Sequence, residues 1–186
     1  QALSQAGYQV VRYADDLVIL CRSENEAQEA LALLQGEITR RQLTLHPEKT
    51  RLVEATQHGG FDFLGYHFER GYRWVRQKSV QALKDKLRAQ TKRTNGTSLA
   101  CIIAKLNRTL RGWFAYFKHS HWPTFRRLDS WLRMRLRSIL RKRHKGRGRG
   151  RGRDHNRWPN AFFAAQGLFT LVAAYEAVRQ SRCGNH

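Results

Sequence analysis

The stretch QVVRYADDLVILC, residues 9–21, places a polar centre between two short apolar runs. This pattern predicts a β-hairpin with Tyr13 to Asp16 at its tip. Asp15 and Asp16 then project from one turn, where their like charges repel unless a cation lies beside them. A divalent metal ion is a natural cation for such a carboxylate pair. Taken alone, however, the pair is more simply read as exposed turn residues, because aspartate is common in turns.

Outward from the hairpin, the sequence predicts a β-α-β-β unit. The capping-box spacing Ser23-x-x-Glu26 opens a helix whose apolar residues recur to about residue 41. An extended stretch broken by a proline follows over residues 43–54. Residues 61–68 alternate as a strand, and a turn at Arg70–Gly71 leads into a last short strand.

Beyond these strands the apolar period changes to 3.6 residues, which predicts a helical second half. One helix begins near Val80, and a longer one carries its apolar side from Leu99 to Phe117. A third helix begins after Pro123. Apolar residues return over residues 157–175 and predict a final helix that packs back onto the others.

The charge of the chain is divided at about residue 70. The whole chain has 35 Lys and Arg and 14 Asp and Glu, a formal net charge of +21, but residues 1–70 carry net −3 and residues 71–186 carry net +24. Residues 141–153, RKRHKGRGRGRGR, contain no acid and predict a mobile RG-rich loop. All five Trp lie in the basic part. This combination favours nucleic acid over a membrane surface as the partner.

Apolar runs, the first residues and the cysteines indicate where in the cell the protein is found. No apolar run approaches the roughly 18 to 20 residues that span a bilayer, and the first residues lack the pattern of a signal peptide. Three widely spaced cysteines match neither a zinc site nor a disulfide framework. We therefore expect a cytoplasmic protein without a membrane partner. The chain begins at Gln1 and enters a strand pattern almost at once, so we expect it to be the end of a longer protein.

Three ordered blocks of the first half resemble the palm of reverse transcriptases. The first is VRYADDL at residues 11–17, and the second is LTLHPEKT at residues 43–50, which ends in a Lys–Thr pair. The third is GFDFLGY at residues 60–66, with the pattern F-x-F-L-G. A single short motif would be weak, but three in the right order are specific.

The helical half resembles the maturase, or X, domain of group II intron proteins. LNRTLRGWFAYF at residues 106–117 is similar to the signature L-N-x-x-L-R-G-W-x-x-Y-Y, and the likeness continues over residues 128–143. Phe117 stands where the family more often has Tyr. A retron or diversity-generating reverse transcriptase would not explain this segment. The two resemblances together cover nearly the whole chain.

The resemblance implies an α+β fold. A partial reverse-transcriptase palm (hairpin, helix and antiparallel strands) covers residues 1–76, and an α-helical thumb and maturase domain covers residues 77–186. The implied functions are RNA-directed DNA synthesis with two Mg²⁺ ions, and binding of intron RNA in splicing and mobility. The implied partners are group II intron RNA, an RNA template, a DNA primer and dNTPs. The implied location is the bacterial cytoplasm, in association with RNA or the nucleoid.

The same resemblance assigns the metal and catalytic roles to Asp15 and Asp16, with Asp15 the more direct ligand. The family uses a third carboxylate on an earlier strand, and residues 1–70 offer no convincing substitute. We therefore expect the chain alone to be inactive as a polymerase. The alternative from another class is a non-catalytic RNA-binding splicing factor, in which the acidic pair is a relic.

Further residues are assigned to the primer and the incoming nucleotide, again by resemblance: Tyr13 and Ala14 lie beside the incoming nucleotide and the primer end, and Phe63, Leu64 and Gly65 form the turn that grips the primer strand. Ordinary sheet core is the alternative role for Phe63 and Leu64, because alternating aromatic residues in a strand are usually buried. A solvated surface charge is the alternative for Lys49. The complete set is Tyr13, Ala14, Lys49, Phe63, Leu64 and Gly65.

For the basic half we expect a sequence-tolerant grip on structured RNA, in which Lys and Arg neutralise phosphates. Trp113, Phe114, Phe117 and Trp131 recur at helical spacing and fit a core better than a base platform. Gly112 either lets RNA approach closely or allows helix packing. The RNA-binding candidates are Arg108, Arg111, Arg133, Arg137, Arg141, Lys142, Arg143, Lys145, Arg147, Arg149, Arg151 and Arg153.

Overall fold

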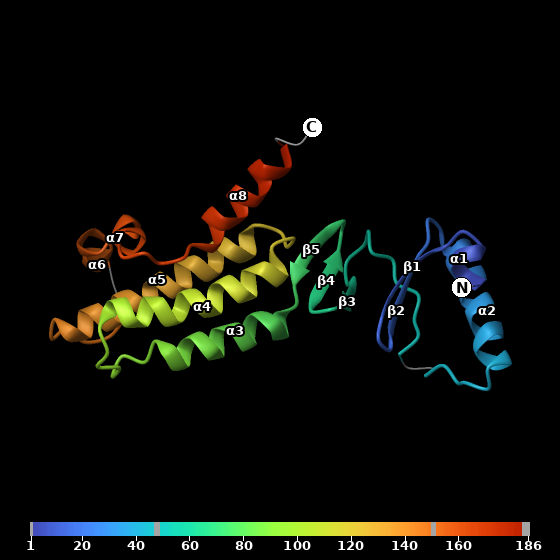
Figure 1. The fold of residues 1–186 in the computed structure, drawn as a ribbon, viewed down its shortest axis with the longest axis horizontal. Coiled ribbons are helices and arrows are strands. Elements are labelled where there is room, and N and C mark those ends of the chain that lie inside the picture. Colours follow the sequence, from blue (N-terminus) through green and yellow to red (C-terminus); the bar gives the residue numbers. More distant parts are fainter. Residues whose placement is uncertain (1, 47–48, 150–151, 184–186) are drawn as a thin grey trace.

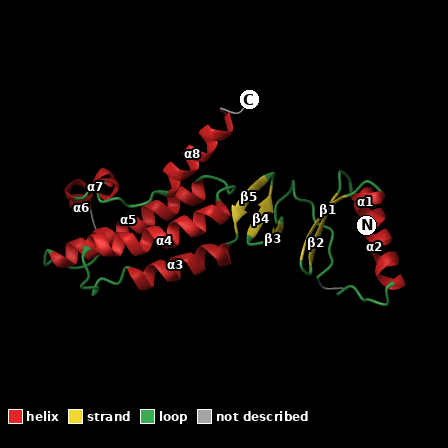
Figure 2. Ribbon diagram, viewed as in Figure 1, coloured by secondary structure: helices red, strands yellow, loops and turns green. Residues whose placement is uncertain are grey.

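The computed structural model describes residues 2–46, 49–149 and 152–183, and it confirms the predicted α+β class. Figure 1 shows three parts in chain order: a hairpin with its helix, a small sheet, and a group of helices. Strands are confined to the first two parts (Figure 2). The elements are α1 Ala2–Gln5, β1 Gln9–Tyr13, β2 Asp16–Leu20, α2 Glu24–Arg40, β3 Phe61–Phe63, β4 Tyr66–Glu69, β5 Tyr72–Val75, α3 Gln77–Gln90, α4 Leu99–Phe117, α5 Pro123–Arg143, α6 Gly152–Arg157, α7 Asn160–Ala165 and α8 Leu171–Cys183.

The predicted hairpin and its helix are confirmed. Strands β1 and β2 pair antiparallel, and the last pair before the turn is Tyr13 with Asp16. Ser23 caps α2 by accepting a hydrogen bond from the N–H of Glu26. The Glu26 carboxylate in turn accepts one from the N–H of Arg22 at 2.6 Å, so the two side chains together satisfy one N–H of the first turn and one just before the helix.

The extended stretch predicted over residues 43–54 forms no strand where it is described, at residues 43–46 and 49–54, and residues 47 and 48 of the LTLHPEKT block lie outside the described residues. The prediction of a single strand over residues 61–68 is wrong. Residues 61–68 are two strands, because Leu64 and Gly65 have φ of +48° and +78° and reverse the chain. Two successive positive φ values match the twist of a tight hairpin. The predicted turn at Arg70–Gly71 has the same geometry and is confirmed.

The resulting sheet, in the order β3-β4-β5, has two chemically different faces. Asp62 pairs with His67, and His67 pairs with Trp74, so these three side chains form one row across the sheet. The opposite face is aromatic, with Phe61 and Phe68 stacked at 5.1 Å between ring centroids. Each face therefore packs against, or opens toward, a different part of the helical half.

The three long helices α3, α4 and α5 lie side by side and bury the main core (Figure 1). Ser98 caps α4, and Pro123 occupies the first turn of α5, where its missing N–H is tolerated. No helix in the described ranges is long and apolar enough to cross a membrane. The most deeply buried apolar residues are Leu87, Ile102, Leu106, Leu110, Phe125, Leu132, Leu136, Ile139, Phe163 and Leu171.

A single last helix over residues 157–175 is not what the structure shows. Pro159 separates α6 from α7, because it lacks an N–H and holds the preceding residue away from helical geometry. Helix α7 ends at a left-handed Gly167, φ +76°, while the N–H of Leu168 donates to the Phe163 carbonyl. The chain then restarts as α8.

The RG-rich segment is also shorter than predicted. Residues 141–143 are the last turn of α5, and residues 152–153 begin α6. Between them, only residues 144–149 are described outside a helix, and residues 150 and 151 lie outside the described part. Asp154 of α6 is buried and forms an ion pair with Arg141 at 2.7 Å, which fastens the two helices together.

Candidate functional site

The acidic pair lies at the tip of the hairpin, as predicted, with Asp15 in the turn and Asp16 as the first residue of β2. Asp15 and Asp16 are both exposed, and Ala14 takes a positive φ of +50° so that the turn can close. The guanidinium Nε of Arg12 donates to the Ala14 carbonyl at 3.1 Å. Tyr13 is 64% exposed, so the tip is open to a ligand rather than packed into the protein.

The chemistry of this donor set fits a magnesium ion, since exposed carboxylate oxygens are the ligands that Mg²⁺ prefers. The described residues nevertheless contain no group of three His, Cys, Asp or Glu side chains that could hold a metal. Two carboxylates on one turn supply part of a two-ion site. Lys49 is exposed on the loop between α2 and β3, where its N–H donates to the His46 carbonyl.

The Leu64–Gly65 turn is held against the end of α4. The hydroxyl of Tyr116 donates to the Leu64 carbonyl at 2.9 Å, and the hydroxyl of Tyr66 donates to the Tyr116 carbonyl at 2.6 Å. Burial raises the pKa of the Tyr66 hydroxyl, which therefore stays a donor. The Phe117 ring lies so close to Gly65 that a Cβ there would be 3.3 Å from it.

These contacts join the F-x-F-L-G block to the L-R-G-W block, two motifs that are far apart in sequence. Phe63 and Leu64 are half-buried, which leaves both the sheet-core and the primer-contact roles open for them. The Gly65 carbonyl accepts from the N–H of Arg76 at 2.9 Å. The turn is thus rigidly positioned from within the protein.

The exposed side of α4 carries Arg108 and Arg111. The guanidinium of Arg111 lies 4.8 Å from the centroid of the Phe169 ring, which holds it in place. A Cβ added at Gly112 would meet no atom within 4 Å, so this glycine is not required for helix packing. A close approach from outside the protein therefore remains the interpretation for Gly112.

Three of the predicted RNA contacts are engaged inside the protein. Arg137 is 3% exposed and donates to the Trp158 carbonyl and to Asn160 Oδ1, both at 2.9 Å, so a surface contact does not fit it. Arg141 is partly buried in its ion pair with Asp154. Arg133 is 17% exposed and lies 4.0 Å from a buried Asp129 oxygen.

The remaining candidates that the structure describes lie on the surface, near the end of α5 and the start of α6. Arg143 bridges to the 95–97 loop by donating to the Thr97 carbonyl. Arg151 lies outside the described residues. The exposed cations of this basic segment are Lys142, Arg143, Lys145, Arg147, Arg149 and Arg153.

The aromatic residues mostly follow the core prediction. Phe114 and Phe117 are buried, and Trp113 is half-buried against Phe117 and Phe125. Trp131 differs, because it is half-buried and ringed by cations that the sequence reasoning missed. Its ring centroid lies 5.8 Å from Lys84, 5.6 Å from Arg88 and 5.4 Å from Arg135. The signal was present as four-residue spacings, 84 to 88 on α3 and 131 to 135 on α5, which place both members of each pair on one helix face.

Comparison with known families gives two matches. Residues 1–68 match the family model described as reverse transcriptase (RNA-dependent DNA polymerase). Residues 80–158 match the model described as group II intron, maturase-specific domain. No curated protein matches the chain. The predicted division between residues 76 and 77 falls between the two matched segments and stays a prediction.

Proposed function

Since the chain belongs to the reverse transcriptase and maturase proteins of group II introns, we propose that its helical half binds intron RNA and that its hairpin serves metal-dependent DNA synthesis. The observation that carries the first part is the division of charge. Residues 71–186 carry net +24, and most of the cations predicted to contact RNA are exposed on α4 and around the end of α5. A surface of this kind neutralises phosphates and supports binding of intron RNA in splicing and mobility.

In the proposed polymerase role, Asp15 and Asp16 would hold Mg²⁺, which when bound lowers the barrier to nucleotidyl transfer by neutralising phosphate charge. The chain's own contribution is positional. The turn holds the two carboxylates next to each other, and the docked Leu64–Gly65 turn offers a fixed surface for the primer strand. The partners in this reaction would be an RNA template, a DNA primer and dNTPs.

The polymerase role is tested in a longer protein that supplies a further carboxylate. Replacing Asp15 by Asn should abolish primer extension on an RNA template and leave RNA affinity unchanged, because an amide is a weak Mg²⁺ ligand and the basic surface is untouched. Undiminished extension would remove Asp15 from the metal site. The 186-residue chain by itself should give no templated synthesis.

The second candidate function is a splicing factor that binds RNA without catalysis. The observation that favours it is the division of charge, since RNA binding by the basic residues 71–186 requires neither Asp15 nor Asp16. In that case the longer protein would show no primer extension, and the double variant D15N/D16N would bind RNA as tightly as the wild type.

Binding to a group II intron transcript, measured by electrophoretic mobility shift, tests the RNA role. The variant R108Q/R111Q should bind several-fold more weakly, because both guanidinium groups are exposed on α4. D15N/D16N is the matched control and should bind like the wild type. Equal affinity of all three proteins would exclude the α4 face, and failure of the wild type to bind would contradict the proposal.

A further inference from the structure

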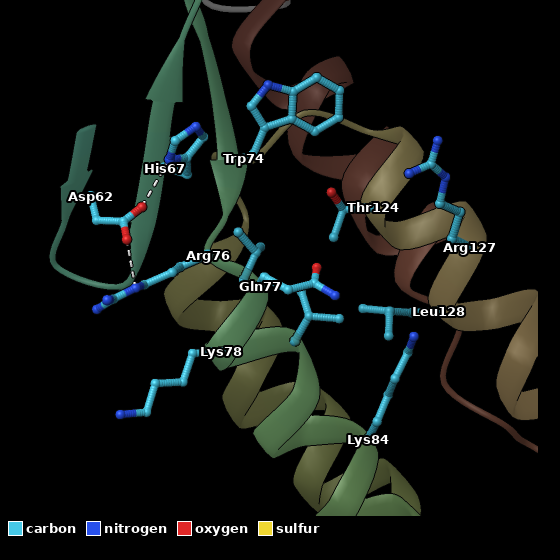
Figure 3. Close-up of a pocket in the computed structure, with 12 residues that line it drawn as sticks. Asp62, His67, Trp74, Arg76, Gln77, Lys78, Lys84, Thr124, Arg127 and Leu128 are labelled. Atoms are coloured by element: carbon cyan, nitrogen blue, oxygen red, sulfur yellow. Dashed lines mark hydrogen bonds and ion pairs between the residues drawn. The ribbon is translucent and has the colours of Figure 1, made fainter. Parts of the chain in front are cut away.

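A cavity of about 740 Å³ lies where the polar face of the sheet meets the beginnings of α3 and α5 (Figure 3). Its walls come from the three-stranded sheet, from α3, which follows it directly, and from α5, which is distant from both in sequence. Trp74 of β5 stands on one side, and Thr124 and Arg127 of α5 stand on the other. A volume of this size is ordinary for a site that takes a small molecule or part of a larger one.

The charge of the cavity wall is strongly positive. Four cationic side chains line it, with Asp62 as the one carboxylate among the lining residues. That carboxylate is already neutralised, since Arg76 lies 2.7 Å and His67 lies 2.8 Å from its two oxygens. Lys84 and Arg127 form no ion pair within the described part of the chain, which leaves their charges available for an anion. The four cations are Arg76, Lys78, Lys84 and Arg127.

The aromatic wall is held in a fixed orientation. The Trp74 ring packs edge-on against His121, with ring centroids 4.5 Å apart, and lies 6.2 Å from Tyr72. The backbone N–H of His121 also donates to the Arg73 carbonyl, which fixes this corner of the sheet to the start of α5. A preorganised indole beside unpaired cations is suited to a planar base that carries a phosphate.

The cationic path continues beyond the cavity. Lys84 lines the cavity and lies over the Trp131 ring, and Arg88, one turn further along α3, lies over the same ring. Arg127 and Trp131 are likewise one turn apart on α5, about 6 Å along the helix axis. A second aromatic ring that shares Lys84 with the cavity and has further cations around it suits a strand with successive phosphates and bases better than a free nucleotide.

We propose that the cavity between Trp74, Lys84 and Arg127 binds one unpaired nucleotide of a nucleic-acid strand, with its base on Trp74 and its phosphate on Lys84 and Arg127. The strand is single, because a base inside a duplex is already stacked on both faces and cannot reach the indole. This proposal rests on the proposed nucleic-acid binding and names the element within it that takes an unpaired base.

Fluorescence anisotropy with a labelled single-stranded oligoribonucleotide of about twelve nucleotides tests this on the full chain. Trp74→Ala should weaken binding about 5- to 100-fold, while Trp74→Phe should retain most of it, since stacking needs only a ring. The variant K84Q/R127Q should reduce the slope of log affinity against log salt by about 0.7, the value for the one phosphate that the two cations share.

The control variant is K86Q/R126Q, which removes the same charges from neighbouring exposed positions of the same helices that do not line the cavity. It should change the slope by clearly less than K84Q/R127Q. Equal effects of the two double variants would overturn the proposal, as would unchanged binding by Trp74→Ala with the fold intact. Those outcomes leave the proposed RNA role standing, whereas failure of the wild type to bind any RNA overturns both.

Two further measurements distinguish a nucleic-acid strand from a free nucleotide as the ligand of the cavity. An oligonucleotide carrying 5-bromouracil should form a photo-crosslink at Trp74, located by mass spectrometry; crosslinks only elsewhere would contradict the proposal. A free nucleoside triphosphate should compete weakly with the oligonucleotide. Competition as strong as that of the unlabelled strand itself would show a small-molecule site in place of a strand site.

Discussion

At the scale of single residues, several charged side chains are positioned by hydrogen bonds that no sequence pattern predicts. Arg135 donates to Thr91 Oγ1 and to the Thr91 carbonyl, and so caps the end of α3 from α5. Asp129 of α5 accepts from the N–H groups of Leu171 and Val172 at 3.1 Å each, and so caps the start of α8. Sequence spacing could not separate these structural charges from RNA-binding ones, because the distinction depends on helix packing.

The buried Asp129 gives a pH-dependent stability. Burial raises the pKa of its carboxyl, and this outweighs the hydrogen bonds from Val172 and Leu171 and the nearby Arg133 charge. The folded state therefore binds the proton more tightly than the unfolded state. The contribution of Asp129 to the free energy of unfolding is largest below the ordinary carboxyl pKa of 3.8. It is lost as the pH rises through the raised pKa of the folded state.

Urea unfolding of the wild type and Asp129→Asn across this pH range measures the effect. The difference in unfolding free energy, wild type minus variant, should fall as pH rises. Asp85→Asn is the control, because hydrogen bonds from Gln81 and Arg88 lower the pKa of the exposed Asp85 and give the opposite trend. A pH-independent difference for Asp129 would show that its carboxyl is not buried as described.

The hairpin tip gives a second prediction at this scale. Mn²⁺, used as a paramagnetic substitute for Mg²⁺, should broaden the amide NMR signals of residues 13–17 before those of other residues, because exposed oxygen donors meet there. The variant D15N/D16N should remove this selective broadening. Broadening centred on another acidic segment, such as the start of α2 with Glu24 and Glu26, would contradict the metal assignment.

At the scale of elements, local signals predicted most of the fold. The YADD hairpin, the Ser23 cap and the three long helices followed from spacing alone, because each is set by neighbours in sequence. Alternation alone predicted a strand through Leu64 and Gly65, since no Asn-Gly or Asp-Gly marks the reversal, whereas the family resemblance placed a turn there. The break of the last helix was marked by Pro159 and Gly167, but the surrounding apolar content suggested continuity.

The docking of the Leu64–Gly65 turn on α4 is a tertiary feature that can be isolated by two glycine substitutions. Gly65 and Gly71 have similar positive φ values, +78° and +74°, but only Gly65 has the Phe117 ring at 3.3 Å from an added Cβ. Gly71→Ala should cost about 1 kcal/mol through backbone strain. Gly65→Ala should cost about 1 kcal/mol or more beyond that, since the ring must move. Chemical denaturation measures both losses, and equal losses would show that the turn is not docked on Phe117.

At the scale of the whole molecule, the chain is an acidic hairpin part joined to a basic helical part. The sequence alone predicted this division, because net charge does not depend on folding. The sequence could not predict which cations remain outside. Arg137 is buried and donates hydrogen bonds to Trp158 and Asn160, whereas Arg147 and Arg149 are exposed.

This contrast between buried and exposed arginines is testable with two variants. Replacing the arginines at 147, 149, 151 and 153 by Gln should flatten the salt dependence of RNA binding by up to about four contacts, with little loss of thermal stability. Arg137→Gln should do the reverse: it should lower the melting temperature and leave the salt slope of the remaining folded protein unchanged. If the RG variant binds with an unchanged slope, the segment is a solvated linker, and the RNA grip lies on the helices.

The central claim is that the helical half binds RNA through its phosphates, and the salt dependence of wild-type binding tests it most directly. The affinity of the 186-residue chain for a group II intron transcript should be measured from 50 to 200 mM salt. For about 6 to 10 phosphate contacts, we expect the affinity to fall by roughly 10³ to 10⁵ over this range. An affinity that is absent at the lowest salt, or that stays nearly constant across the range, would contradict the account.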